Sequence, residues 1–408
     1  MKIIKGFGNI KNKMKITYGK NLYNNLEISS VVSTLKKTTQ MGKAVKEFEN
    51  KIAKLFSKKY GLMVNSGSSA LTLAANVLNL KKGDEVIDPC LNFGTAVSAI
   101  ILSGATPILV DVDIQTLQIN IDQISKKITK KTKAIMVPNL IGNIPNWPEI
   151  YKLARKNKLK IIEDSADTLG ATIKNKSTGI YSDISITSFY GSHVISCAGN
   201  GGMFLTNDRK IYEKAKVLRS WGRMSTLIKD SENIKKRLNI KLNGVDYDKK
   251  FVFSEVGYNF EPSEIGASFG LIQLEKFKKF SSIRNINFNL HLKFFKRFHH
   301  YFIIPKIEKY VKTNFLAYPI ILKKNKLFNR KKLQIYLENN NIQTRPIFSG
   351  NILRHPAFKN IINKKNKLNS FESADYIMKN GILIGCHQGL SKKNINYIHS
   401  QIHKLITE

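Results

Sequence analysis

Short apolar runs alternate with helical stretches along the first half of the chain. The runs are rich in β-branched residues and have the length of buried strands; they cover residues 61–64, 85–88, 106–112, 134–137, 159–164, 184–190 and 203–206. This alternation favours a mostly parallel sheet covered by helices on both faces. Ligands of such sheets bind at the carboxyl ends of the strands, so the residues after each run are the first candidates for function.

The two ends of the chain have different patterns. Residues 1–40 are polar and irregular, and we expect an arm that leads into a helix near Lys43, where Val45, Phe48 and Ile52 share one face. From about Ile283 the pattern changes to a helix rich in Phe, Lys and Asn, followed by strands such as 315–322. We therefore predict an arm (1–40), a large domain (41–284) and a smaller α+β domain (285–408).

Composition narrows the class of protein. The 408 residues suffice for two domains, and the apolar content of 42% fits a soluble globular protein. We find no apolar leader and no run of about 18 apolar residues, so we expect a cytoplasmic protein without membrane contact. The cysteines Cys90, Cys197 and Cys386 form no C-x-x-C pair, so their spacing predicts neither a disulfide framework nor a metal site.

The chain is strongly basic. It has 67 basic and 29 acidic residues and a net charge of +38, which would normally suggest a nucleic-acid partner. The lysines are spread along the chain among Asn and Ile, and no basic motif is interleaved with aromatics. A solvated surface that also helps to attract a diphosphate is the simpler interpretation, and we expect no nucleic-acid partner.

One strand, turn and helix combination has the form of an anion site. The strand at 61–64 is followed by Asn65-Ser66-Gly67-Ser68-Ser69 and then by a helix over 71–78. Free backbone N–H groups and the helix dipole converge at such a helix start. An ordinary serine N-cap has the same appearance, so the motif alone is weak.

The stretch 187–208 delivers a histidine between strand ends. A strand ending near Tyr190 is followed by a turn that carries His193, and a loop of small residues, 196–202, leads into the next strand. Upstream, the strand 159–164 ends in carboxylates, the last being Asp164, for which helix capping is the alternative role. This layout indicates a ligand held between strand ends.

The same stretch, T-S-F-Y-G-S-H-V-I-S-C-A-G-N-G-G-M-F-L-T-N-D, resembles the active-site loop of the DegT/DnrJ/EryC1/StrS family of pyridoxal-phosphate (PLP) sugar enzymes. The resemblance covers roughly residues 40–400. It implies an α/β, aspartate-aminotransferase-like fold (PLP fold type I), in which the large domain has a mostly parallel seven-stranded sheet and the C-terminal domain is α+β. In the family's aminotransferases a lysine that forms the Schiff base stands where this chain has His193. Histidine there resembles the sugar 3-dehydratase branch.

The resemblance also assigns the cofactor site. It implies that backbone and hydroxyl donors at 67–69 bind the cofactor phosphate and that Phe93 stacks on the pyridine ring, although a single aromatic is more often core. Asp164 would keep the pyridine nitrogen protonated, so that the ring accepts electrons. Asp167 and Ser188 would lie beside the cofactor.

Four further residues are assigned by the same comparison. Asn259, in G-Y-N, would reach across a homodimer interface to the phosphate of the neighbouring site, so that each active site is shared; a turn asparagine is the alternative. The motif R-x-x-F-x-G-N makes Arg345 and Asn351 candidates for substrate contacts, with a structural salt bridge as the alternative for Arg345. His387 would lie on a loop near the active site. No metal site is expected.

Histidine changes the chemistry open to the site. Imidazole shuttles a proton but forms no imine, so the amine form of the cofactor, pyridoxamine phosphate (PMP), would bind non-covalently. The resemblance then implies loss of the C3 hydroxyl from a nucleotide-linked 4-keto-6-deoxyhexose, in the synthesis of a deoxysugar for surface polysaccharide. His193 suits this because its ordinary pKa is about 6.5.

The route that regenerates the cofactor divides the branch. The iron–sulfur type carries a cysteine in E-D-x-C-D and a C-x-C after W-G-R, where this chain has Ala166 and 224–226 (M-S-T). We therefore expect no cluster and predict that L-glutamate restores PMP. The rival hypotheses are a sugar aminotransferase with an altered lysine, a catalytically idle binding or regulatory relative, and a nucleic-acid-binding protein.

Overall fold

A computed structural model describes residues 15–228, 230, 232–363 and 365–407. Its larger part is built on a seven-stranded sheet of order β1-β9-β8-β5-β4-β2-β3, in which only β9 runs antiparallel to its neighbours. This confirms the expected mostly parallel sheet. The strands are β1 (Tyr60–Val64), β2 (Glu85–Pro89), β3 (Thr106–Val110), β4 (Thr132–Pro138), β5 (Lys160–Asp164), β8 (Ile184–Ser188) and β9 (Gly202–Thr206).

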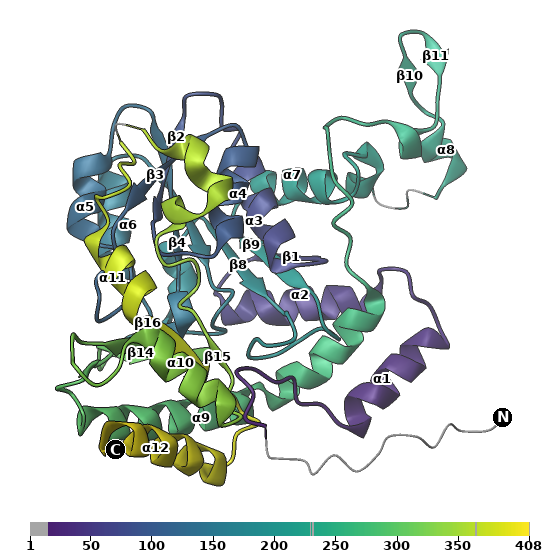
Figure 1. Ribbon diagram of the computed structural model, residues 1–408. Helices are drawn as coiled ribbons and strands as arrows, with labels where there is room; N and C mark the ends of the chain where they lie inside the picture. The colour runs from purple at the N-terminus through teal and green to yellow at the C-terminus, as the bar shows by residue number, and fades with distance from the viewer. Residues whose placement is uncertain (1–14, 229, 231, 364, 408) are drawn as a thin grey trace.

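Helices cover both faces of this sheet (Figure 1). Successive side chains of a strand point to opposite faces, so Met136 packs with α3 and α4, whereas Ile135 packs with α5 and α6. Because both faces are buried, the strands carry apolar side chains on both sides, as Ile135 and Met136 of β4 do. The helices are α2 (Lys43–Leu55), α3 (Gly67–Asn76), α4 (Gly94–Leu102), α5 (Ile121–Lys127), α6 (Trp147–Lys156) and α7 (Arg209–Arg219).

The smaller part is built on a four-stranded antiparallel sheet of order β12-β14-β16-β15. Its core is rich in Phe and Ile, and the phenylalanines include those of the Phe-rich helix expected after Ile283. The elements are β12 (Phe302–Ile303), β14 (Ala317–Leu322), β15 (Thr344–Arg345), β16 (Gly381–Gly385), α10 (Arg330–Asn339), α11 (Glu372–Asn380) and α12 (Lys392–Thr407). A short second sheet joins β13 (Val311–Lys312) to β6 (Thr172–Ile173) and β7 (Lys176–Ser177) of the larger part.

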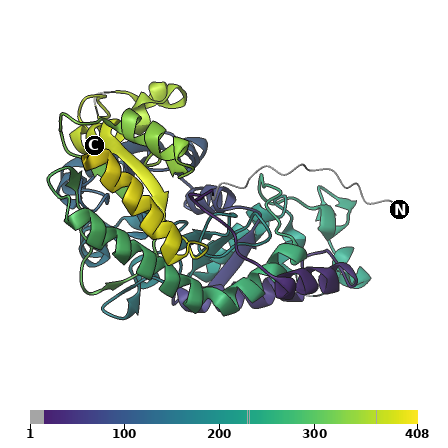
Figure 2. The same ribbon diagram turned by 60° about the horizontal axis from the view of Figure 1, so that its bottom comes forward.

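One long helix, α9 (Glu264–Lys296), runs beneath both parts (Figure 2). Ala267 and Phe280 pack in a cluster with α2, and Phe288 and Phe295 pack in the core of the smaller part. The expected domain boundary at 284/285 thus falls inside a continuous helix. Glu264, in its first turn, accepts hydrogen bonds from the backbone N–H groups of Gly42, Ala44 and Val45 and so caps α2.

The expectation that residues 1–40 are irregular is wrong for the described part. Helix α1 (Asn25–Leu35) begins with a complete capping box, formed by Asn24 and Glu27, and packs against α9. Ahead of it, Ile16 forms a parallel bridge with Ile342 of the smaller part. The capping box was readable from the sequence, whereas this long-range pairing was not. The segment 15–23 therefore crosses between the two parts.

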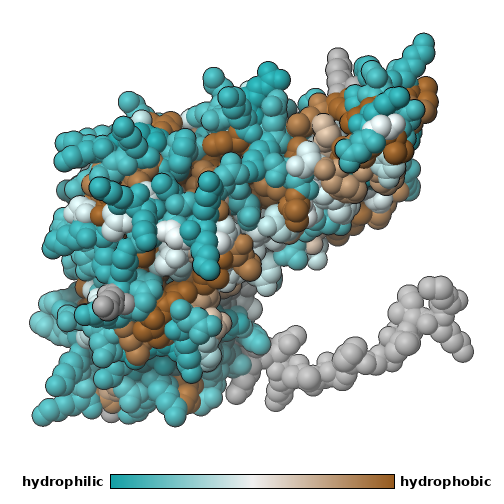
Figure 3. Space-filling model, turned by 90° about the horizontal axis from the view of Figure 1, so that it is seen from above, coloured by the Kyte–Doolittle hydropathy of each residue, from teal (hydrophilic) through white to brown (hydrophobic). Residues whose placement is uncertain are grey.

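A projecting segment, residues 224–228, 230 and 232–256, extends away from the body (Figure 1). It contains α8 (Ile234–Arg237), β10 (Lys241–Leu242) and β11 (Val245–Asp246). Hydrophobic surface gathers on it (Figure 3). Its exposed apolar side chains include Ile234, Leu238, Leu242, Val245, Tyr247, Phe251, Phe253 and Val256. Among the residues that the structure describes, none of the helices is long and apolar enough to cross a membrane.

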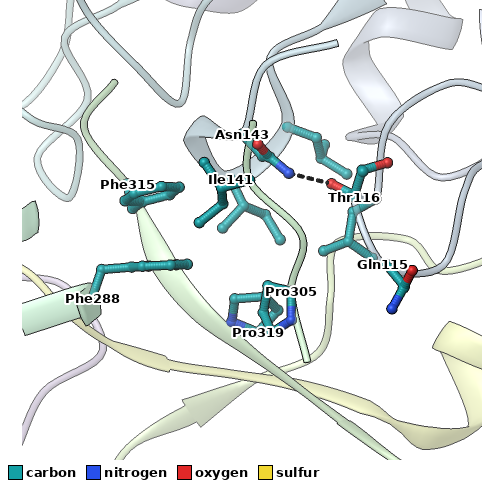
Figure 4. A pocket seen from close by; sticks show the side chains of 11 residues that line it. Gln115, Thr116, Ile141, Asn143, Phe288, Pro305, Phe315 and Pro319 are labelled. Carbon is teal, nitrogen blue, oxygen red and sulfur yellow. Dashed lines mark hydrogen bonds between the residues drawn. The ribbon is translucent and has the colours of Figure 1, made fainter. Parts of the chain in front are cut away.

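A turn between the two parts separates two hollows. Ile141 has φ 60° and lies between Leu140 and Gly142. On one side of this turn, Phe288, Pro305, Phe315 and Pro319 close a hollow of only about 10 Å³ (Figure 4). That volume holds about one water molecule, so this hollow is not a ligand site. The large cavity lies on the other side of the turn.

Candidate active site

The large cavity has a volume of about 790 Å³ and opens at the carboxyl ends of three parallel strands. The last residues of β4, β5 and β8, which are Pro138, Asp164 and Ser188, all line it. The start of α3 and Arg345 of the smaller part also line it. Ligand sites of proteins commonly have about 300–1,000 Å³, so this cavity has room for a cofactor with a substrate.

The start of α3 forms a cradle for an anion. Ser66 caps the helix by accepting a hydrogen bond from the N–H of Ser69 at 3.1 Å. The N–H groups of Gly67 and Ser68, which both line the cavity, have no acceptor among the described residues. Free N–H groups at a helix start bind phosphate. The hydroxyl of Ser69 instead donates to Asn65 Oδ1 at 2.6 Å, and Ser69 does not line the cavity, so its role as a donor to the phosphate stays a prediction.

Gly67 is required by close approach rather than by backbone conformation. A Cβ atom at Gly67 would lie 2.7 Å from Cβ of Ser188. We expect Gly67→Ala to push the α3 start away from Ser188, to weaken PLP binding about 10-fold or more, and to cost about 1–3 kcal/mol of stability. Absorbance titration with PLP and chemical unfolding measure the two effects.

A glycine with more room provides the control. A Cβ atom at Gly191 meets nothing closer than the carbonyl oxygen of Gly199 at 3.8 Å. Gly191→Ala should leave PLP affinity within about twofold, since no contact is tightened. Equal losses of affinity in the two variants would contradict the explanation by close approach.

Two buried carboxyl groups face the cavity. Asp164 Oδ1 accepts from the N–H of Ala166 at 2.9 Å, and its other oxygen has no partner among the described residues. Burial, and then the charge of Glu163, raise the pKa of Asp164 to about 6. Asp164 does not cap a helix, because residues 165–169 are not helical. A buried carboxyl with a free oxygen fits a protonated ring nitrogen, so the site fits PLP at this end.

Asp167 holds the turn described above. Its Oδ2 accepts from the N–H of Ile141 at 2.7 Å, and burial, with the charge of Asp164, raises the pKa of Asp167 to about 7. The folded protein therefore binds this proton more tightly than the unfolded chain, where the pKa is about 3.9. The stability from this proton is full below about pH 4 and is lost as the pH rises towards 7.

This proton linkage gives a prediction for the cofactor-free protein. Asn at position 167 still accepts from Ile141 but does not titrate. Between pH 5 and pH 8 the free energy of unfolding of the wild type should fall by roughly 2–4 kcal/mol more than that of Asp167→Asn. Urea unfolding at the two pH values measures it. A difference between the proteins that does not change with pH would contradict the raised pKa.

His193 is fixed as a base that faces the cavity. Its Nδ1 lies 3.3 Å from the carbonyl oxygen of Ser188. Because a carbonyl only accepts, Nδ1 carries the proton and Nε2 keeps its lone pair. Burial, and then the positive charge of Arg284, lower the pKa of His193 to about 4, against the opposing hydrogen bond to Ser188. The imidazole is therefore neutral at pH 7, with the lone pair of Nε2 unprotonated.

The structure also brings Phe93 and Arg345 to the cavity. Phe93 is 57% exposed and meets the ring of Phe348 edge-on at 6.2 Å. The guanidinium of Arg345 lies 5.9 Å from the ring centroid of Tyr18, and its Nη1 donates to the carbonyl of Thr344. Arg345 is exposed and makes no salt bridge to a described residue, which leaves it available for an anion.

Sequence reasoning missed Tyr18 and Gly19, which line the cavity from the N-terminal segment. Tyr18 donates its backbone N–H to Gln343 Oε1 at 2.9 Å. Burial, with the charge of Asp167, raises the pKa of the Tyr18 hydroxyl well above its ordinary value, so it is uncharged at pH 7. An apolar position in a polar segment carried no signal that could have located it.

Two residues expected to contact the substrate lie outside the cavity. Asn351 is fully buried; it accepts from Cys90 Sγ and donates to Asp375 Oδ1 at 2.8 Å, so it organises its own loop. His387 is also buried, with Nε2 3.0 Å from the carbonyl oxygen of Thr17 and Nδ1 accepting from the N–H of Gly389. Both side chains are engaged within the fold, and the structure does not bring them to the cavity; their assignment to the substrate stays a prediction.

Asn259 lies on the surface and outside the cavity of its own chain. Its carbonyl accepts from Asn65 Nδ2 at 3.4 Å, so its backbone runs beside the anion cradle. Its role at a neighbouring site stays a prediction.

The geometry agrees with known proteins. Residues 23–403 match the DegT/DnrJ/EryC1/StrS aminotransferase family. The chain belongs to this family. Its members are PLP enzymes that modify sugars. In this chain the α3 cradle would hold the phosphate of PLP, and Asp164 would contact its ring nitrogen.

Curated relatives of the chain carry out two kinds of chemistry. It is 33% identical to the lipopolysaccharide biosynthesis protein RfbH of Salmonella typhimurium, over 87% of this chain and 83% of that protein. It is 32% identical to GDP-4-keto-6-deoxy-D-mannose 3-dehydratase of Escherichia coli O55:H7, over 92% and 96%. It is also 33% identical to GDP-perosamine synthase of Escherichia coli O157:H7, over 75% and 77%.

Solved structures of related proteins have closely similar folds. A mutant of GDP-4-keto-6-deoxymannose-3-dehydratase (ColD) with bound GDP-perosamine superposes with a TM-score of 0.84 at 30% identity, over 95% of this chain and 100% of that one. A second structure of that dehydratase holds a trapped PLP-glutamate geminal diamine, with a TM-score of 0.83, 30% identity and coverage of 95% and 99%. The aspartate-aminotransferase-like α/β fold expected from the sequence is confirmed.

Proposed function

We propose that this protein is a PMP-dependent 3-dehydratase of a nucleotide-linked 4-keto-6-deoxyhexose. One observation carries the proposal: the group delivered to the cavity by the β8 turn is the neutral imidazole of His193. Among the described residues that line the cavity, none is a lysine. A site without a lysine has no amine to bind the cofactor covalently, so catalysis there relies on proton transfer.

Each residue then has a definite task. When bound, PMP would supply an amine that condenses with the sugar ketone and a ring that accepts electrons. The N–H groups of Gly67 and Ser68 hold its phosphate, and the Asp164 carboxylate holds a proton on its ring nitrogen. Nε2 of His193 takes up a proton at the cofactor's C4′ carbon and can return it to the C3 hydroxyl, which leaves as water.

The partners follow from the site and the relatives. The cavity accommodates a nucleotide-linked sugar beyond the cofactor, with Arg345 offered to the diphosphate and Phe93 to the pyridine ring. We propose L-glutamate as the source of the amine, because ColD has been trapped with a PLP-glutamate adduct. Cys90, Cys197 and Cys386 lie in three different hydrophobic clusters, which supports a site without an iron–sulfur cluster.

We further propose a cytoplasmic homodimer with shared active sites, which makes surface-polysaccharide sugars. The apolar side chains of α1 and of the projecting segment are exposed, as Leu26 and Val256 are, and they offer an interface. Asn259 is exposed as well, as a residue that serves a neighbouring site has to be. Size-exclusion chromatography with light scattering tests the dimer.

The decisive experiment is spectroscopic. The purified protein is mixed with PLP and its absorbance is recorded before and after L-glutamate is added; borohydride then reduces any imine. Conversion to the amine form with no cofactor fixed to the protein supports the proposal. Cofactor fixed by reduction would show that a lysine serves the site, and the protein would then be an aminotransferase.

The second candidate function is a nucleotide-sugar aminotransferase, because GDP-perosamine synthases are among the relatives. Mass spectrometry separates the two reactions. With GDP-4-keto-6-deoxymannose and glutamate, a dehydratase forms a 3-deoxy sugar and ammonia, whereas an aminotransferase forms an amino sugar.

A further inference from the structure

Arg284 is a fully buried cation in the middle of α9. Its Nε donates to Gln388 Oε1 at 2.6 Å, and Nη1 donates to the carbonyls of Phe315 and Leu316 at 3.0 and 3.1 Å. Among the described residues it makes no salt bridge, although a buried charge usually has a partner of opposite sign. An arginine held only by neutral acceptors in the interior needs a reason.

The remaining nitrogen of the Arg284 guanidinium, Nη2, contacts the turn that carries His193. Nη2 donates to the carbonyl of His193 at 3.0 Å and to that of Ser192 at 3.4 Å. One planar guanidinium therefore joins the catalytic turn of the larger part to the start of β14 and to the 388 turn of the smaller part. Gln388 adds a second link, since its Nε2 donates to the carbonyl of Val194 at 3.4 Å.

We propose that Arg284 is the positioning residue of His193, whose backbone it clamps to the smaller part of the protein. The inference rests on His193 acting as the base of the proposed function. Within the turn, the backbone of His193 makes one further hydrogen bond, from its N–H to the carbonyl of Tyr190. Without the clamp, the carbonyl side of His193 would lose its anchor to the smaller part, and Nε2 would lose its fixed direction.

The charge of Arg284 adds a second effect. Burial lowers the pKa of Arg284 only to about 10, so it is a cation at pH 7. It disfavours a second positive charge on His193. Tyr18 and Cys386 act on the charge of Arg284. Tyr190 meets the His193 ring, and the other titratable or charged groups that line the cavity with His193 are Tyr18, Asp164, Asp167, Arg345 and His355. Tyr18 and Cys386 are uncharged at pH 7, since burial raises the pKa of both, to about 12 for Cys386.

Two substitutions separate clamp from charge. Arg284→Lys keeps the charge but cannot reach all of the carbonyls; Arg284→Met keeps the length and loses both. The ring protons of His193 are followed by NMR against pH in the cofactor-free protein, where His193→Asn identifies their signal. We expect the apparent pKa of His193 to rise by about one unit in Arg284→Met and by less than half of that in Arg284→Lys. In PMP-loaded enzyme, kcat should fall at least 10-fold in both, with KM within about threefold.

Arg219→Met is the matched control, because Arg219 is also buried but bonds to Glu49 and to the carbonyl of Met63. It should leave the titration of His193 unchanged. The proposal is overturned if Arg284→Lys keeps wild-type kcat, or if the pKa of His193 is the same in Arg284→Lys and Arg284→Met. If Arg284→Met does not fold, the Arg284→Lys kcat decides alone. The NMR result does not depend on whether the protein is a dehydratase.

Discussion

Replacing His193 with asparagine is expected to lower kcat for sugar dehydration about 10²–10⁴-fold while the cofactor stays bound. Asparagine has nearly the same size, and its amide can donate to the carbonyl of Ser188 as Nδ1 does. It has no group that takes up a proton at neutral pH. Release of the 3-deoxy sugar, measured by mass spectrometry, gives kcat, and absorbance titration gives the affinity for PMP.

Tyr190→Phe is the control for this experiment. Tyr190 lines the same cavity and meets the ring of His193 edge-on at 5.9 Å, so the substitution removes a hydroxyl beside the base but keeps the ring contact. We expect less than about a tenfold effect on kcat. A His193→Asn enzyme with more than a tenth of wild-type activity would show that another group moves the proton.

Replacing Asp164 with asparagine is expected to weaken cofactor binding about 10- to 150-fold, which corresponds to the loss of a charged hydrogen bond of about 1.5–3 kcal/mol. Catalysis should fall further, because a ring nitrogen without its proton accepts electrons poorly. Asn still accepts from the N–H of Ala166, so the local turn remains. Titration with PLP and single-turnover rates at saturating PMP separate the two losses.

Asp88→Asn provides the comparison for Asp164→Asn. Asp88 is a fully buried carboxyl of β2, bonded to Asn92, and it does not line the cavity. Asp88→Asn replaces one carboxyl oxygen by an amide nitrogen, as Asp164→Asn does, but away from the cavity. It should therefore leave the affinity for PLP unchanged. Similar losses of affinity in both variants would mean that burial, rather than contact with the ring nitrogen, makes Asp164 important.

Much of the fold could be predicted because the sheet is buried on both faces. The strands are therefore short runs rich in apolar residues, and the runs at 85–88 and 159–164 differ from β2 and β5 by one residue at one end. The strand-end position of Asp164 follows directly, whereas the strand predicted to end near Tyr190 ends at Ser188, two residues earlier. The order of the motifs along the chain then indicated the family, and the turn after the strand at 184–190 indicated His193 as the candidate catalytic residue.

The rest depends on contacts between distant segments. Nothing near Tyr18 indicates that it lies in the cavity, because its place is set by the pairing of Ile16 with Ile342. Asn351 and His387 stand in motifs that resemble functional ones, yet their side chains face inward, and only coordinates distinguish the two orientations. In the sequence, Arg284 cannot be distinguished from the other basic residues of its helix. Its lack of a carboxylate partner becomes visible only in the folded structure.

The continuous helix α9 has a consequence for how ligands enter and leave. Its 33 residues span about 50 Å at about 1.5 Å per residue. Both parts of the protein pack against this one helix. Opening the cavity by a hinge between the sheets would require this helix to bend and lose backbone hydrogen bonds. We therefore expect substrate exchange to depend on short rim segments such as 345–350, where Phe348 has φ 45° and Gly350 has φ 59°. Substitutions in the segment 345–350 would then change the turnover rate. Higher solvent viscosity, which slows large domain movements, would leave the turnover rate unchanged.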